Sequence, residues 1–138
     1  MKATNYLEAA ILNHFFRNTP QTPAAQLFVR LYISDPTDED VGTEITGGGY
    51  VPQIVAFTAP VQVDRPSPDT GTRAQISNNA EIRFPVATSD WGTISHFGIA
   101  TAATGGQLLA HAPVPVPKII ENGDEAKFNV GTLTISMD

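Results

Sequence analysis

Four carboxylates fall within six residues in the segment Asp35–Asp40, the densest group of side chains that could do chemistry. Such a group could hold calcium, because carboxylate oxygens are ligands that this ion prefers. An EF-hand loop, however, needs oxygens at alternate positions, a glycine at the sixth position and a glutamate at the twelfth. Pro36 and Thr37 interrupt that spacing, and the sixth position is Asp40. We interpret the segment as a solvated acidic turn that ends a strand.

The three histidines, His14, His96 and His111, lie far apart in the sequence. A preformed metal-binding pair needs two ligands close together on one face of a strand or helix, at a spacing of two or four residues. None of these histidines has such a partner. His96 falls in a strand-like segment, where we expect it to make a structural hydrogen bond. The sequence therefore predicts no metal site and no cofactor.

Motifs for nucleophilic and phosphate chemistry are missing. There is no G-x-S-x-G, the pattern that places a serine nucleophile on a sharp turn. Gly47-Gly48-Gly49 lacks the following Lys-Ser/Thr of a phosphate-binding loop, so we interpret it as a bend whose corner Tyr50 anchors. Without cysteine there is no thiolate zinc site, no cysteine nucleophile and no disulfide. We predict no catalytic residues and hence a protein that is not an enzyme.

Length and charge narrow the class of protein. A chain of 138 residues with 41% hydrophobic residues fits a single domain, 1–138, with an N-terminal helix and arm at 1–20 and a β-sandwich at 27–138. The net charge of −6, with no cluster of lysine and arginine, argues against a nucleic-acid partner. No apolar run approaches the ~20 residues of a membrane span, and the N-terminus has no basic-then-apolar signal pattern, so we expect no membrane partner.

The first segment is the only one with helical spacing. We expect a helix at about Asn5–Arg17, with Asn5 as the cap and Glu8 reaching back to it. Its apolar stripe consists of Leu7, Ile11, Leu12, Phe15 and Phe16. Because an isolated helix of about twelve residues is marginal in water, this one must dock on something. It either covers one end or edge of its own sheet or docks on a neighbouring subunit.

The rest of the chain alternates apolar and polar residues with a period of two. We predict an all-β protein, a β-sandwich or flattened barrel of seven to nine short antiparallel strands with one N-terminal α-helix. The odd-numbered residues of Leu27–Ile33 and Leu133–Met137 should face the core.

Proline, glycine and asparagine mark the connections between these strands. The expected connections are a polar surface loop at Pro60–Thr72, a tight turn at Asn78-Asn79 between the strands Arg73–Ser77 and Glu81–Phe84, a turn at Thr104-Gly105-Gly106, and a hairpin turn at Glu121–Asp124. Pro113, Pro115 and Pro117 cannot donate to a central ladder, so Ala112–Pro117 is an edge or an extended connector.

Several ordered segments, spread over nearly the whole chain, carry a resemblance to a known family. They are Asn5-Tyr6-Leu7-Glu8 with Ile11-Leu12-Asn13-His14, Leu31-Tyr32 running into Asp35-Pro36, Gly42-Thr43-Glu44-Ile45 with Gly47-Gly48-Gly49-Tyr50, Phe84-Pro85 before Ala87-Thr88, Trp91-Gly92-Thr93-Ile94-Ser95-His96-Phe97-Gly98-Ile99, Thr104-Gly105-Gly106 with Leu108-Leu109, and Gly123-Asp124, Phe128, Gly131 and Leu133-Thr134-Ile135. Together they resemble a family of small bacteriophage virion proteins, labelled phage tail fibre proteins.

The resemblance implies an all-β structural subunit of a phage particle without enzymatic activity, located in the virion and assembled in the bacterial cytoplasm. Its partners would be other phage structural proteins, either the major capsid protein or tail proteins, and copies of itself. We expect a capsid cement or decoration protein on the outside of the head, where an acidic surface fits better than beside packaged DNA. The N-terminal helix and Ala112–Pro117 are the candidate arms for binding neighbours.

Two alternatives remain open. One is a tail- or fibre-associated adaptor. The other is a carbohydrate-binding module for host attachment, which would need exposed aromatic side chains from the small set Trp91, Tyr32 and Tyr50. Trp91 could lie at a loop mouth for that purpose, or it could fill the end of the core.

Overall fold

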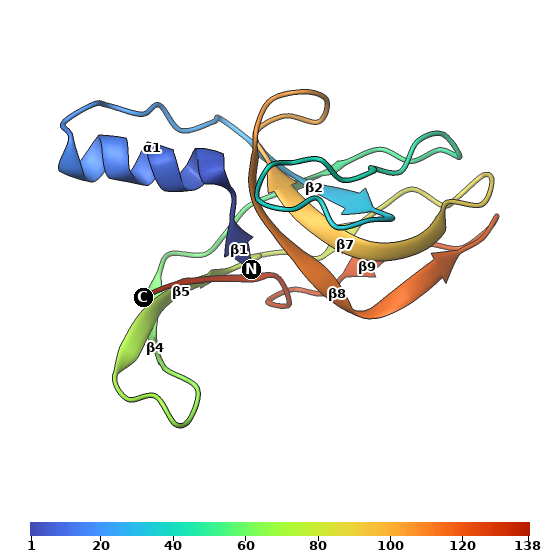
Figure 1. The fold of residues 1–138 in the computed structure, drawn as a ribbon. Helices are drawn as coiled ribbons and strands as arrows, with labels where there is room; N and C mark the ends of the chain where they lie inside the picture. Colours follow the sequence, from blue (N-terminus) through green and yellow to red (C-terminus); the bar gives the residue numbers. More distant parts are fainter.

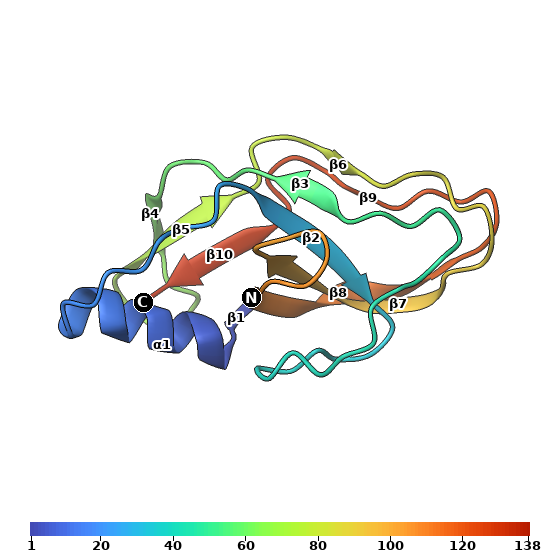
Figure 2. The ribbon, with the colours of Figure 1, turned by 90° about the horizontal axis from the view of Figure 1, so that it is seen from above.

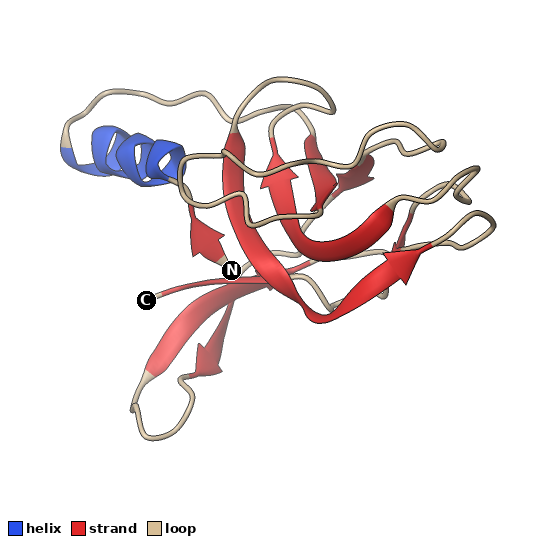
Figure 3. Ribbon diagram, turned by 45° about the vertical axis from the view of Figure 1, so that its right-hand side comes forward, coloured by secondary structure: helices blue, strands red, loops and turns tan.

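A computed structural model, describing residues 1–138, shows a mostly antiparallel β protein with one helix (Figure 1). The elements are β1 (Lys2–Ala3), α1 (Asn5–Phe16), β2 (Leu27–Tyr32), β3 (Gln53–Val55), β4 (Val61–Asp64), β5 (Thr72–Ser77), β6 (Ile82–Arg83), β7 (Gly92–Ala100), β8 (Leu108–Ile120), β9 (Lys127–Phe128) and β10 (Thr134–Met137). The predicted all-β class with one N-terminal helix is confirmed, as the colouring by secondary structure makes plain (Figure 3). More strands form than the seven to nine expected, because β1, β6 and β9 are two-residue pairings that leave no periodic signal.

The strands form three antiparallel sheets. The largest has the order β1-β8-β7-β2-β3, the second β10-β5-β4, and the third is the pair β6-β9 (Figure 2). The core lies between the large sheet and the smaller ones. Phe97 of β7, for example, meets Phe128 of β9 with ring centroids 5.2 Å apart, and Phe128 also contacts Phe84. Only 23 of the 138 residues are buried, so the stabilising apolar contacts are concentrated in this small interior.

Strand β2 shows why the apolar alternation predicted the core. Val29 and Leu31 are fully buried on the inner face, as expected of odd-numbered residues. Tyr32 is buried as well, but in a separate cluster with Ala100 and Leu108 on the outer face, which the loops cover. Ile33 departs from the prediction and is 45% exposed, because the strand ends at Tyr32.

The C-terminal strand follows its predicted alternation less closely. Leu133 is buried and Ile135 is packed against the core, but Met137 is 54% exposed. Strand β10 is the outer strand of its sheet and Met137 is its last residue, so nothing lies above that side chain.

The Gly47–Gly49 bend makes the corner that the sequence predicted, with Tyr50 as its anchor. All three glycines have positive φ, between 57° and 76°. The Tyr50 hydroxyl accepts a hydrogen bond from the Leu31 amide at 2.9 Å and donates one to Glu44 Oε1 at 2.8 Å. Burial raises the pKa of Tyr50 far above its ordinary value, so the hydroxyl keeps its proton and remains a donor.

Trp91 closes the other side of this corner. Its indole Nε1 donates to the Gly48 carbonyl at 2.8 Å, and its ring meets Tyr50 edge-on at 5.5 Å between centroids. A side chain at Gly48 would place its Cβ 2.8 Å from the same Nε1, so the approach requires glycine. Trp91 is 5% exposed and therefore fills the end of the core.

Two expected connections take a different form. The segment 60–72 is not a plain surface loop, because β4 pairs with β5 in a hairpin from Val61↔Gln75 to Asp64↔Thr72. The backbone hydrogen bonds between β4 and β5 hold this segment in a hairpin although many of its side chains are polar. Asn78-Asn79 does not join a hairpin either, because β6 pairs with β9 rather than with β5.

Asn78 instead ties three segments together with a buried side chain. Its amide group donates to the carbonyls of Ala80 and Asn129, at 2.8 and 2.9 Å, and its Oδ1 accepts from the Leu133 amide at 2.9 Å. Because a buried asparagine must satisfy both ends of its amide, these bonds fix the chain after β5 and before β10.

The proline series lies at an edge, as predicted, but inside a long strand. Beyond His111, β8 has only β7 as a neighbour, and the ladder jumps from His96↔Pro113 to Ile94↔Lys118. The residues between bulge away from β7, where missing amide donors carry no penalty. The following turn at Glu121–Asp124 forms, with the Asp124 amide 2.9 Å from the Glu121 carbonyl, but it leads into β9, so it closes no hairpin.

Replacing Tyr50 with phenylalanine should lower the free energy of unfolding by about 1–3 kcal/mol, because the Leu31 amide loses its acceptor in a partly buried position. Urea denaturation followed by tryptophan fluorescence measures this loss. Tyr6→Phe is the matched control, since Tyr6 is 45% exposed and its hydroxyl makes no hydrogen bond. Equal stability of the two variants would contradict the anchoring role.

Candidate functional site

The acidic turn is fastened to the outer face of the large sheet by two histidines. His111 Nε2 lies 2.9 Å from Asp38 Oδ1, and its Nδ1 lies 3.6 Å from Asp35 Oδ1. His96 Nε2 lies 3.8 Å from Asp35 Oδ2. The turn and the histidines lie far apart in the sequence, and the pairing of β2 with β7 and of β7 with β8 brings them together.

This arrangement acts as a clamp on the backbone. The Asp38 carbonyl also accepts a hydrogen bond from the Asn5 amide at 3.0 Å, which connects the turn to the start of α1. A backbone hydrogen bond from Thr37, helped by the nearby histidines, holds the pKa of Asp35 below its usual value. No group of three or more histidine, aspartate or glutamate side chains is arranged to hold a metal ion.

The third histidine and the aromatic residues suggested for carbohydrate binding lie outside this clamp. His14 lies on α1, and its Nδ1 accepts a hydrogen bond from the Gln21 amide at 3.1 Å. The aromatic set suggested for carbohydrate binding is turned inward: Trp91 and Tyr32 are buried and Tyr50 is half-buried. None of the three presents an open ring face for a sugar.

Helix α1 is the most unusual surface of the molecule, because it buries none of its residues. Leu12, Phe15 and Phe16 of the predicted apolar stripe are 56%, 73% and 78% exposed. In Figures 1 and 2 the helix extends past the end of the large sheet. The predicted stripe is therefore divided: Leu7 and Ile11 are half-buried toward the chain's own sheet, whereas Leu12, Phe15 and Phe16 are left uncovered.

The helix is anchored to the large sheet at its beginning. Its cap is Thr4 rather than the predicted Asn5: the Thr4 hydroxyl accepts from the Leu7 amide at 3.4 Å and donates to the Leu108 carbonyl at 2.6 Å. The cap shifts by one residue because Thr4, at the end of β1, is itself buried against β8. Between the helix and the sheet lies a groove of about 440 Å³, which Leu7, Ile11 and Leu109 help to line.

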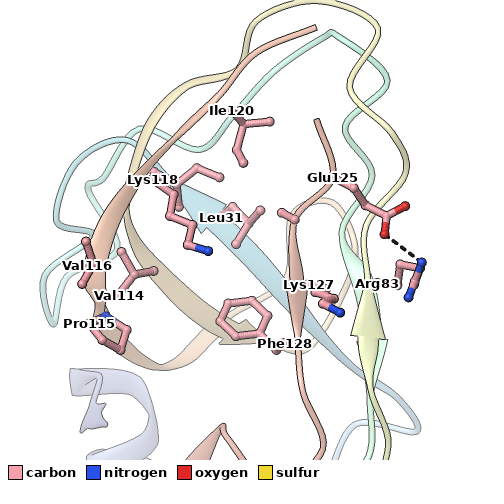
Figure 4. Close-up of a pocket in the computed structure, with 12 residues that line it drawn as sticks. Leu31, Arg83, Val114, Pro115, Val116, Lys118, Ile120, Glu125, Lys127 and Phe128 are labelled. Carbon is pink, nitrogen blue, oxygen red and sulfur yellow. Dashed lines mark ion pairs between the residues drawn. The ribbon is translucent and has the colours of Figure 1, made fainter. Parts of the chain in front are cut away.

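A second groove, of about 480 Å³, opens between β8 and β9 on the inner side of the large sheet (Figure 4). Leu31, Ile94 and Ile120 of the core reach its floor. The bulged proline segment forms one wall, and Lys127 and Phe128 belong to the other. This groove follows from the departure of β8 from the ladder, which the proline spacing signalled only as an edge.

Comparison with known protein families and with curated proteins identifies the family of this chain. Residues 2–136 match the family described as podophage GP4 fiber I protein gp80. No curated protein matches the chain. The single helix, α1, does not combine the length and the apolar character needed to cross a bilayer. Because the family match covers almost the entire chain, the protein belongs to this podophage fibre family and is a structural component of the phage virion.

The lowered pKa of Asp35 gives a pH test of the contacts of its carboxylate, first the hydrogen bond from the Thr37 amide and then the nearby histidines. Because the folded pKa is lower than the unfolded value of about 3.8, Asp35 stabilises the protein above that pH, and the contribution disappears as the pH falls through the folded pKa. The difference in free energy of unfolding between wild type and Asp35→Asn should therefore be constant near neutrality and shrink below pH 3.8.

Urea denaturation at a series of pH values measures that difference. Asp69→Asn serves as the control, since Asp69 is exposed and its side chain makes no ion pair or hydrogen bond. If Asp35→Asn and Asp69→Asn follow the same pH dependence, the charge of the Asp35 carboxylate does not contribute to stability.

Proposed function

We propose that this chain is a structural subunit of a virion fibre and that it joins the particle through the exposed face of helix α1. The family match supports the fibre assignment, since its description names a fiber protein. The partner is another phage structural protein that offers an apolar surface to Leu12, Phe15 and Phe16. In this role the chain binds and is bound; it does not convert a substrate.

The observation that carries the proposal is the solvent exposure of two adjacent phenylalanines on a helix. Contiguous exposed apolar patches on soluble proteins mark interaction surfaces or aggregation hazards. Burying a phenylalanine side chain is worth about 1.5–3 kcal/mol, so covering Phe15 and Phe16 gives assembly a large driving force. A twelve-residue helix of this kind is also stabilised when its apolar face is packed.

A capsid cement role is the second candidate. The net charge of −6 favours a position away from packaged DNA, which the outer head surface and the fibre share equally. The family description favours the fibre. The number of copies in purified virions separates the two, because a head decoration repeats over the whole shell and a fibre subunit does not.

Replacing Phe15 with alanine tests the helix directly. Because Phe15 is 73% exposed, the free energy of unfolding of the isolated variant should differ from that of wild type by no more than about 0.5 kcal/mol, as is usual for surface substitutions. Its incorporation into virions, measured by quantitative blotting after assembly in an infected host, should fall strongly.

Phe84→Ala provides the matched contrast. Phe84 is 1% exposed, so its loss should cost about 3–5 kcal/mol in the isolated protein. If Phe15→Ala destabilises the isolated chain as Phe84→Ala does, the helix belongs to the chain's own core. If Phe15→Ala is stable and still incorporated normally, the helix is not the assembly surface.

A further inference from the structure

The groove between β8 and β9 combines an apolar floor with unpaired positive charge. Leu31, Ile94 and Ile120 supply the floor. Arg83 at the rim is already paired with Glu81 and Glu125, at 3.0 and 2.9 Å. Lys118 and Lys127 also line the groove, both exposed and neither within reach of a carboxylate.

These two lysines are unusual in a chain with only eight lysine and arginine residues against fourteen carboxylates. Figure 4 shows them on opposite walls, Lys118 on β8 and Lys127 on β9. An apolar occupant with carboxylates on its flanks would therefore satisfy both the floor and the rim of the groove.

The acidic turn of this same protein has that composition. Its clamp uses Asp35 and Asp38, which leaves the exposed carboxylates of Glu39 and Asp40 without an ion pair. Val41 follows directly and is 68% exposed, an apolar side chain at the end of an acidic run.

The turn is also rigidly shaped before it meets any partner. The Val41 amide donates to the Pro36 carbonyl at 2.7 Å, and the Asp40 amide donates to the Thr37 carbonyl at 3.3 Å. Thr37 and Asp40 both adopt positive φ, a conformation that non-glycine residues rarely take outside tight turns. A preorganised loop loses less conformational entropy on binding than a flexible one.

We propose that the groove between β8 and β9 binds the acidic turn of a second copy of this chain, with Val41 on the apolar floor and Glu39 and Asp40 beside Lys118 and Lys127. The inference rests on the proposed function and names the partner of a second assembly surface. Opposite charges at the two surfaces steer the copies together and set their register.

The two surfaces lie on opposite faces of the large sheet. The turn packs on His96, whose strand partner Tyr32 belongs to the outer cluster. The groove floor includes Leu31, the next residue along β2, which belongs to the inner core. One copy therefore offers its turn to a neighbour while its own groove stays open to another. Such a head-to-tail contact repeats from copy to copy and gives a ring if it closes or a filament if it does not.

Sedimentation velocity over a concentration series tests this contact. Wild type should self-associate at low salt and dissociate in about 1 M salt, where the screening length is about 3 Å. Lys118→Glu/Lys127→Glu and, separately, Glu39→Lys should each weaken self-association by at least about tenfold, because the double variant replaces two close charge pairs with like-charge contacts and Glu39→Lys replaces one. Asp69→Lys makes the same charge change as Glu39→Lys at a distant exposed position and should associate like wild type.

Mixing the Glu39→Lys variant with the Lys118→Glu/Lys127→Glu variant is the decisive experiment. Each variant alone lacks one of the two matching surfaces. In the mixture, the intact groove of Glu39→Lys meets the unaltered acidic turn of Lys118→Glu/Lys127→Glu, so a native contact can form between the two variants. The mixture should therefore recover association that neither variant shows alone. A wild type that stays monomeric at low salt, or a mixture that stays monomeric, overturns the proposal. Circular dichroism confirms that each variant is folded.

The result is separable from the test of helix α1. Association through the helix would persist in high salt and disappear in Phe15→Ala, and finding that pattern would overturn the groove contact while supporting the helix. Conversely, variants that lose self-association through the groove retain Phe15 and Phe16. Failure of Phe15→Ala to affect virion incorporation would count against the proposed function only.

Discussion

Strand β8 is the element on which both assembly surfaces depend, and its pairing with β1 sets the first of them. Lys2 and Ala3 add a short strand opposite His111 and Ala110, and the Thr4 amide continues the contact with a hydrogen bond to the Leu109 carbonyl at 2.9 Å. This pairing fixes where the helix begins and directs it past the end of the sheet. Because the helix runs away from this anchor, Leu12, Phe15 and Phe16 find no cover within the chain.

The same strand produces the groove a few residues later. The prolines of β8 cannot donate to β7, so the ladder breaks after Pro113 and resumes at Lys118. The strand stays extended but bows away, and the interior between the sheets opens to solvent beside β9. One strand thus sets an apolar helix at one end and an apolar groove with a cationic rim at the other. Both features expose apolar surface, which is unfavourable for an isolated molecule in water and favours binding when the molecule is built into a particle.

Much of the fold could be predicted from the sequence because its signals are local. Helical spacing at Leu7–Phe16, alternation at Leu27–Tyr32 and three adjacent glycines before Tyr50 each act through neighbouring residues. The errors concern contacts between distant segments. Nothing near Asn78 indicates that its side chain will bind Asn129 and Leu133, and nothing near the acidic turn indicates that His96 and His111 will meet it.

The same contrast between local signals and distant contacts holds for the assembly surfaces. The sequence marked the apolar stripe of the helix and the proline segment as candidate arms, but not which surfaces the fold would leave open. That depends on the tertiary arrangement: whether the sheet reaches Phe15, and whether β9 closes against β8. Lys118 and Lys127 were missed altogether, because isolated lysines carry no local signal and acquire meaning only when the fold places them around one apolar floor.

Amide hydrogen–deuterium exchange of helix α1, compared between the isolated protein and purified virions, tests the central claim most directly. The account predicts rapid exchange at Leu12–Phe16 in the isolated chain, since an uncovered short helix opens readily, and strong protection in the virion. The amides of β2 and β7, paired in the core of the sheet, should be protected in both samples. A helix that exchanges equally in the isolated protein and in the virion would contradict the claim that assembly covers it.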